Sequence, residues 1–104
     1  MAFKNVVAII RKDKLNIIID KLQVSGVSGV SVVEVKGIGE YINTFSRNPL
    51  AESIKLELII ESDKVDDVIK LVMDQANTGI EGDGIVAVHN IEAFYRIRDK
   101  QKLS

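Results

Sequence analysis

The fold is decided by residues 54–61, which read Ile-Lys-Leu-Glu-Leu-Ile-Ile-Glu. Every even-numbered position in this stretch is apolar, and charged side chains take three of the four odd-numbered positions. Because successive side chains of a strand point to opposite sides, this alternation predicts a β-strand with one buried face. A helix should follow directly, with Ser62 as its N-cap and Asp63 in its first turn. Its buried stripe would consist of Val65, Val68, Ile69, Val72 and Ala76.

The rest of the chain repeats this strand–helix order. The predicted elements are, in order, a strand over residues 6–11, a helix over 14–22 that follows the capping residue Asp13, a strand over 30–36, the strand and helix described above, and a strand over 85–88. No periodicity holds between residues 37 and 53, which we interpret as a long loop. The order predicts an α+β, ferredoxin-like βαββαβ sandwich in a single domain over residues 1–104.

Two features of this sandwich remain to be accounted for. The helices would cover one face of the sheet, and we expect Val30, Val32 and Ile59 on the other face, among polar residues. Oligomerisation is the simplest cover for that face. Towards the C-terminus, residues 95–98 are predicted to be extended and residues 99–104 to form a polar tail.

Length and composition exclude several classes of protein. A chain of 104 residues allows one domain, and 46% hydrophobic with 28% charged residues is a globular composition. The net charge of −1 gives no general attraction to nucleic acid or to anionic membranes. The absence of cysteine excludes disulfides and thiolate metal sites. Neither a membrane span nor a signal peptide is predicted, so we expect a cytoplasmic protein without a metal.

Two segments could bind an anion. Residues 78–84 contain three glycines and could turn several backbone N–H groups toward one point, as in phosphate sites. The same glycines would also suit a plain connecting turn. Arg96 and Arg98 would lie on one side of a strand, where two guanidinium groups suit a phosphate. A solvated edge is the alternative for this pair.

No catalytic constellation accompanies these segments. His89 is the only histidine, and no partner is placed for it by its spacing, so a structural or solvated role is favoured. Asp63, Asp66 and Asp67 fall in the first turns of a helix, where acidic residues complement the helix dipole. The sequence therefore does not predict an enzyme.

Several segments resemble parts of one known family. The similar parts are residues 7–15 (first strand and helix start), 29–39 (second strand and entry to the T-loop, about 37–53), 55–59 (third strand), 78–85 (B-loop) and 90–104 (C-terminal segment with the arginine pair). Taken in order, these segments make the chain resemble the PII signal-transduction family over nearly its whole length.

The resemblance implies a homotrimer that holds an adenine nucleotide, ADP or ATP, in each cleft between subunits. By position, the nucleotide-binding residues would be Ser31, Gly37, Gly39, Glu57, Gly82, Asp83, Gly84, Arg96 and Arg98. Ser31 would lie near the adenine and Glu57 would face the ribose. Gly82 and Gly84 would offer amides to the phosphates, and Gly37 and Gly39 would close over them. Both arginines would pair with phosphate oxygens.

The sequence also departs from the family pattern. Ile85 takes the place of a phosphate-binding lysine, and Ser53 that of a lysine which grips the carboxylate of 2-oxoglutarate. Glu40 and Tyr41 replace a basic residue and a glutamine that helps to bind Mg²⁺. The T-loop is shorter and lacks a clear modifiable tyrosine. We therefore expect that 2-oxoglutarate sensing is lost and that ADP or AMP competes well with ATP.

These observations predict a nucleotide-responsive regulatory protein. It would control a target protein, with a transporter subunit expected before a metabolic enzyme, through a loop that carries Tyr41, Phe45 and Arg47. The alternative is a trimer that has lost nucleotide binding and senses another small effector, as ACT-type domains bind amino acids. Neither a nucleic-acid partner nor membrane insertion is expected.

Overall fold

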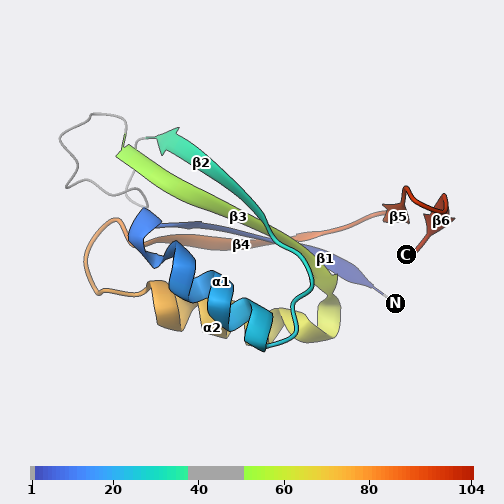
Figure 1. Ribbon diagram of the computed structural model, residues 1–104, viewed down its shortest axis with the longest axis horizontal. Helices are drawn as coiled ribbons and strands as arrows, with labels where there is room; N and C mark the ends of the chain where they lie inside the picture. The colour runs from blue at the N-terminus through green and yellow to red at the C-terminus, as the bar shows by residue number, and fades with distance from the viewer. Residues whose placement is uncertain (1, 38–50) are drawn as a thin grey trace.

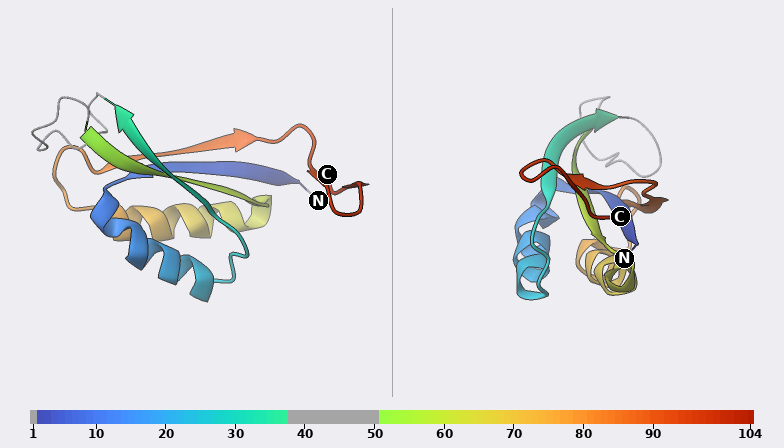
Figure 2. Two further views of the ribbon diagram at one scale, coloured as in Figure 1. Left: turned by 45° about the horizontal axis from the view of Figure 1, so that its top comes forward. Right: turned by 90° about the vertical axis from the view of Figure 1, so that its right-hand side faces the viewer.

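The computed structural model describes residues 2–37 and 51–104. Its strands and helices are β1 (Phe3–Ile10), α1 (Leu15–Val24), β2 (Ser31–Gly37), β3 (Ala51–Glu61), α2 (Val65–Ala76), β4 (Gly84–Asn90), β5 (Tyr95–Arg96) and β6 (Gln101–Lys102), with single 3-10 turns η1 (Lys12–Lys14) and η2 (Ser62–Lys64). The main sheet has the order β2-β3-β1-β4, and all neighbouring strands are antiparallel. Both helices lie on one face of this sheet (Figures 1 and 2). The α+β class is thereby confirmed, and the layout agrees with a ferredoxin-like sandwich.

The core lies between the helices and the central strands β1 and β3. The even-numbered positions of the stretch 54–61 are at most 7% exposed, as their alternation predicted. Their neighbours on β1, which include Val6 and Ala8, are buried with them. In α2, four residues of the predicted stripe are buried and the fifth, Ile69, packs against the core at its margin. The hydrophobic pattern therefore accounts for the two-layer packing.

The predicted helix caps are wrong. Asp13 and Ser62 lie inside η1 and η2, and neither helix has a side-chain hydrogen bond at its N-cap. The preceding 3-10 turn provides backbone acceptors instead: the Leu15 N–H donates to the Lys12 carbonyl, and the Val65 N–H donates to the Ser62 carbonyl. Because a turn of this kind satisfies amides at the start of the helix, no capping side chain is required.

The prediction for the uncovered face of the sheet is partly wrong. Val32 lies opposite Leu56, so it shares the helix-covered face, and Val30 packs against the core. Ile59 does lie on the uncovered face and is 47% exposed. Val33 and Val35 lie on that face in place of the two predicted valines, because they are opposite Lys55 and Ser53, which alternate with the core residues Ile54 and Leu56. The loop prediction was also too long, since β3 begins at Ala51.

The C-terminal segment is a hairpin and not an extended strand with a tail. Tyr95–Arg96 pairs with Gln101–Lys102, and residues 97–100 form the turn between them. The Leu103 N–H donates to the Phe94 carbonyl over 2.8 Å, and the Phe94 ring packs on Phe3 with ring centroids 4.9 Å apart. The hairpin projects beyond the sheet, near the N-terminus (Figure 1).

Candidate functional site

The predicted site residues lie at two opposite ends of the molecule. Gly84 pairs with Ile10 at the end of the sheet where β2 also stops, at Gly37. β4 leaves the other end of the sheet at Asn90, opposite Lys4, and continues into the hairpin that carries the two arginines. The longest dimension of the molecule is 47 Å. The glycine-rich turn and the hairpin lie toward opposite ends of the molecule (Figure 2). One chain therefore does not bring the glycine-rich turn and the arginine pair together.

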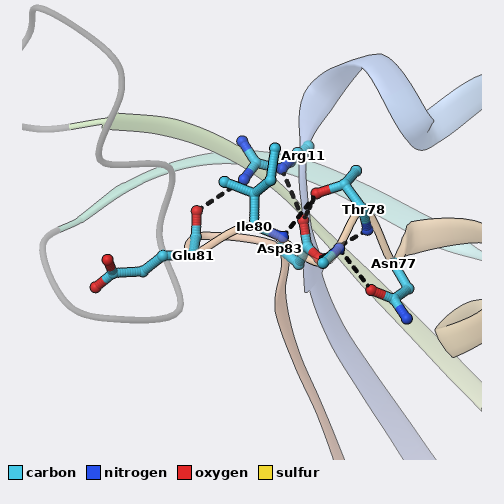
Figure 3. Close-up of polar contacts among 7 residues, drawn as sticks. Arg11, Asn77, Thr78, Ile80, Glu81 and Asp83 are labelled. Carbon is cyan, nitrogen blue, oxygen red and sulfur yellow. Dashed lines mark hydrogen bonds and ion pairs between the residues drawn. The ribbon is translucent and has the colours of Figure 1, made fainter.

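The glycine-rich turn is organised by the carboxylate of Asp83. Its Oδ2 accepts the Thr78 N–H over 2.7 Å and the Gly79 N–H over 3.0 Å, and its Oδ1 accepts the Thr78 hydroxyl (Figure 3). Asn77 Oδ1 also accepts from the Gly79 N–H, over 2.8 Å, and Thr78 Oγ1 accepts from the Ile80 N–H over 3.3 Å. An anion thus does occupy the amides of this turn, and that anion is a side chain of the protein itself.

Arg11 fastens this turn to the end of β1. Its Nε donates to Asp83 Oδ1 over 3.0 Å, and its Nη2 donates to the Glu81 carbonyl over 2.8 Å (Figure 3). The Arg11 side chain is 12% exposed and that of Asp83 is 22% exposed. The sequence analysis gave Arg11 no role, because its partner lies 72 residues away. The one available signal was its position at the end of the predicted strand over residues 6–11.

The same contacts set the charge state of Asp83. The hydrogen bond from the Thr78 hydroxyl is the main cause that holds the Asp83 pKa well below its usual value. The Thr78 amide, Arg11 and the Gly79 amide lower this pKa further, whereas burial opposes them. The carboxylate is therefore ionised at neutral pH and acts as a permanent acceptor inside the turn.

Gly84 is required where the turn joins the sheet. Its φ is +115°, and a Cβ atom at this position would overlap the carbonyl oxygen of Ile9. Gly79 and Gly82 also have positive φ, and Gly82 is buried. The glycines thus serve the backbone geometry of the turn, which was the plainer of the two interpretations of this segment.

A cavity of about 380 Å³ lies beside the turn, between α2 and the start of β4. Its lining is largely apolar and includes Val72, Met73 and Ile85, with Asn77 and Asp83 among the polar contributors. This volume falls within the range of pockets that hold small ligands. The cavity is therefore a second feature, besides the turn, that could receive part of a ligand.

Ser31 and Glu57 are brought together on the uncovered face. They lie directly opposite each other on β2 and β3, so their side chains share that face. The Glu57 carboxylate is 3.0 Å from Lys55 Nζ. Ile85, on β4, lies on the same face opposite Ile9 and is 41% exposed. An apolar side chain thus stands where the resemblance would require a cation.

The arginine pair does not have the predicted arrangement. Arg96 ends β5, whereas Arg98 lies in the following turn, so the two are not neighbours on one side of a strand. Arg96 Nη2 is 2.6 Å from Asp99 Oδ2 and donates to Gln101 Oε1 over 2.9 Å. Arg98 is exposed and has no recorded partner among the described residues.

Several predicted residues lie outside the described residues. These are Gly39, Tyr41, Phe45 and Arg47, together with Glu40. Within residues 2–37 and 51–104, no group of three or more histidine, aspartate or glutamate residues could hold a metal ion. In the same part of the chain, no helix has both the length and the apolar character needed to cross a membrane.

Comparison with known proteins settles the family. The family model for "Nitrogen regulatory protein P-II" matches residues 3–101. The chain belongs to the P-II family. Similar P-II proteins are those of Cyanidium caldarium (31% identical; 96% of this chain and 95% of the relative covered) and Rhodobacter capsulatus (35% identical; 91% of each). The P-II 2 protein of Methanothermobacter thermautotrophicus is 31% identical over 91% of this chain and 89% of its own length.

Membership of the P-II family confirms the resemblance drawn from the sequence. It identifies the chain as a regulatory signal-transduction protein, and it agrees with the absence of a catalytic constellation in the sequence. Proteins of this family interact with target proteins.

Proposed function

We propose that this P-II protein binds an adenine nucleotide, ADP or ATP, in clefts between the subunits of a homotrimer, and that the nucleotide controls its interaction with a target protein. The observation that carries the proposal is the separation of the candidate residues. The turn with Gly82 and Gly84 lies at one end of the main sheet. Arg96 and Arg98 lie on the hairpin beyond its other end (Figure 1). Such a set can form one pocket only when two copies lie side by side.

The uncovered face of the sheet supports the association of copies. Val33, Ile59 and Ile85 are on this face, and each of these residues is between 41% and 54% exposed. Burying apolar surface of this kind contributes about 25 cal/mol per Å². Exposed apolar side chains on a sheet face that no helix covers are typical of a protein that assembles.

In the proposed cleft, the residues have distinct tasks. Ser31 and Glu57 would contact the nucleoside, and Gly37 and Gly39 would close over the phosphates. The amides of Gly82 and Gly84 and the guanidinium groups would contact the phosphates. We assign Asp83 to holding the turn in shape, because both of its oxygens already accept hydrogen bonds.

The nucleotide would act through the loop between β2 and β3, residues 38–50, with Tyr41, Phe45 and Arg47 as contacts for the target. A transporter subunit in the cytoplasmic membrane is the first candidate for that target, and a metabolic enzyme is the second. This part of the proposal rests on the P-II family and on the position of the loop between β2 and β3. It assigns no catalysis to the chain.

Isothermal titration calorimetry of Arg96→Ala and Arg98→Ala with ADP tests the site. Losing the charged hydrogen bonds of one guanidinium should cost about 1.5–3 kcal/mol, which is about ten- to hundredfold in affinity. Lys102→Ala, which removes a cation from the same hairpin, is the matched control and should bind as the wild type does. Unchanged affinity in both arginine variants would refute the assignment.

A second function is favoured by the cavity beside the turn. Its lining is largely apolar, and the amides of Thr78 and Gly79 are already occupied by Asp83. These features suit a small effector other than a nucleotide. Thermal shift assays against adenylates and amino acids separate the two functions, since a ligand at 100 times its dissociation constant adds about 2.7 kcal/mol of stability.

A further inference from the structure

The hairpin contains a carboxylate, that of Asp99, which would compete with a bound phosphate for Arg96. Asp99 stands three residues later and accepts from Arg96 Nε over 3.2 and 3.1 Å and from Nη2 over 2.6 Å. Gln101 Oε1 accepts from the same Nη2 over 2.9 Å. The Nε–H and Nη2 donors of the guanidinium are therefore taken up within the hairpin, which leaves Nη1 for an incoming group.

The geometry of the turn sets up this contact. Lys100 has a φ of +57°, and the Gln101 N–H donates to Asp99 Oδ1 over 3.3 Å. Both bring the Asp99 carboxylate back over the end of β5. The pair is also accessible, because the side chains of Arg96 and Asp99 are 40% and 39% exposed. A phosphate that reaches Arg96 must therefore share the guanidinium with a carboxylate or displace it.

We propose that Asp99 is a specificity-determining residue that disfavours nucleotides with additional phosphate charges. The inference rests on the proposed function, since it concerns the same nucleotide site. A carboxylate beside the phosphate-binding guanidinium repels an anionic ligand in proportion to the charge of that ligand. The site is thereby biased toward nucleoside mono- and diphosphates and against triphosphates. Arg98 has no partner among the described residues. Its positive charge would attract nucleoside mono-, di- and triphosphates alike.

The test compares Asp99→Asn with the wild type by calorimetry against AMP, ADP and ATP in the absence of Mg²⁺. The amide keeps the shape of the carboxylate and removes its charge. Exposed ion pairs are weak, so we expect affinity to rise about two- to fivefold, with the largest gain for ATP and the smallest for AMP. Asp20→Asn, on the exposed surface of α1, removes the same charge elsewhere and should leave all three affinities unchanged.

Three outcomes separate the inference from the function on which it rests. Equal gains for all three nucleotides, or no gain, would overturn the specificity role of Asp99 while leaving nucleotide binding intact. Weaker binding in Asp99→Asn and in Asp99→Ser would show that the carboxylate positions Arg96, which also contradicts the inference. If neither the wild type nor Asp99→Asn binds any adenylate, the proposed function fails and the inference fails with it.

Discussion

The two ends of the molecule each carry an arginine paired with an aspartate, and the two pairs are built differently. Arg11 and Asp83 are 72 residues apart, 12% and 22% exposed, and bonded to the backbone of the turn that they join. Arg96 and Asp99 are three residues apart and about 40% exposed, on a projecting hairpin. The same two side chains therefore form a structural brace at one end and an exchangeable contact at the other.

This difference assigns different tasks to the two ends. The glycine-rich turn is held in shape by the hydrogen bonds of Asp83 and Arg11. On the hairpin, Arg96 is paired with Asp99 in an exposed contact that an incoming phosphate would have to share or displace. A cleft between two copies would then combine the glycine-rich turn of one copy with the arginine-bearing hairpin of the next.

The strongest test of the rigid end is Gly84→Ala. The new Cβ would overlap the Ile9 carbonyl at a positive φ, so β4 would have to separate from β1. We expect a loss of at least about 3 kcal/mol in the free energy of unfolding, measured by urea denaturation. Gly29→Ala is the matched control, since its Cβ would meet no atom within 4 Å. Similar stabilities for the two variants would contradict the described junction.

Removing the brace should have the next largest effect. Arg11→Ala breaks two hydrogen bonds of a charged group, so we expect a loss of about 1.5–3 kcal/mol in the free energy of unfolding. A double-mutant cycle with Asp83→Asn should show coupling between the two sites. Additive losses in that cycle would mean that the pair does not act as a unit.

The pH dependence of stability offers a third test. The pKa of Asp83 is lowered in the folded state, so its contribution is fully present above the unfolded pKa of about 3.9 and is lost as pH falls through the folded pKa. Urea unfolding should show a constant advantage of the wild type over Asp83→Asn between neutral pH and about pH 5, because the unfolded carboxyl group is ionised throughout. The advantage should shrink below about pH 4. An advantage that grows on acidification would contradict the assigned contacts.

The smallest effect is expected at the hairpin. Asp99→Asn should leave the midpoint of urea unfolding unchanged, because the pair is exposed and ties together only neighbouring residues. Comparison with Asp83→Asn in the same assay measures the difference between the two ends directly. If Asp99→Asn lowered the free energy of unfolding as much as Asp83→Asn does, the two arginine–aspartate pairs would not differ in their structural role.

The parts of the fold that sequence reasoning found are those with a strong period. The alternation over residues 54–61 and the apolar stripe of α2 each leave only one side of the element that can be buried. The two buried sides therefore predicted correctly how α2 packs on the sheet. β2 was assigned the wrong face because valines occupy both of its sides, and only the register with β3 decides between them. The caps were missed because backbone carbonyls of 3-10 turns take the place of side chains.

The site was harder to predict for a different reason. The hairpin has polar strands and a turn with a non-glycine residue, Lys100, at positive φ, so it lacks the usual turn signals. The contact between Arg11 and Asp83 joins distant parts of the sequence, and no local spacing can reveal it. The residues for the glycine-rich turn and the arginine pair could be named from the sequence, but their partners within the chain could not.

The most direct test of the account is a mixing experiment between two variants that fail for different reasons. One carries Ser31→Trp, which would fill the cleft from the sheet side at an exposed position, and the other carries Arg96→Ala with Arg98→Ala. Each variant alone should not bind ADP, whereas copies refolded together should regain binding at those clefts that combine an intact sheet with an intact hairpin. No recovery in mixtures shown by native mass spectrometry to contain both variants in one oligomer, or full binding by a monomer, would contradict a site shared between copies.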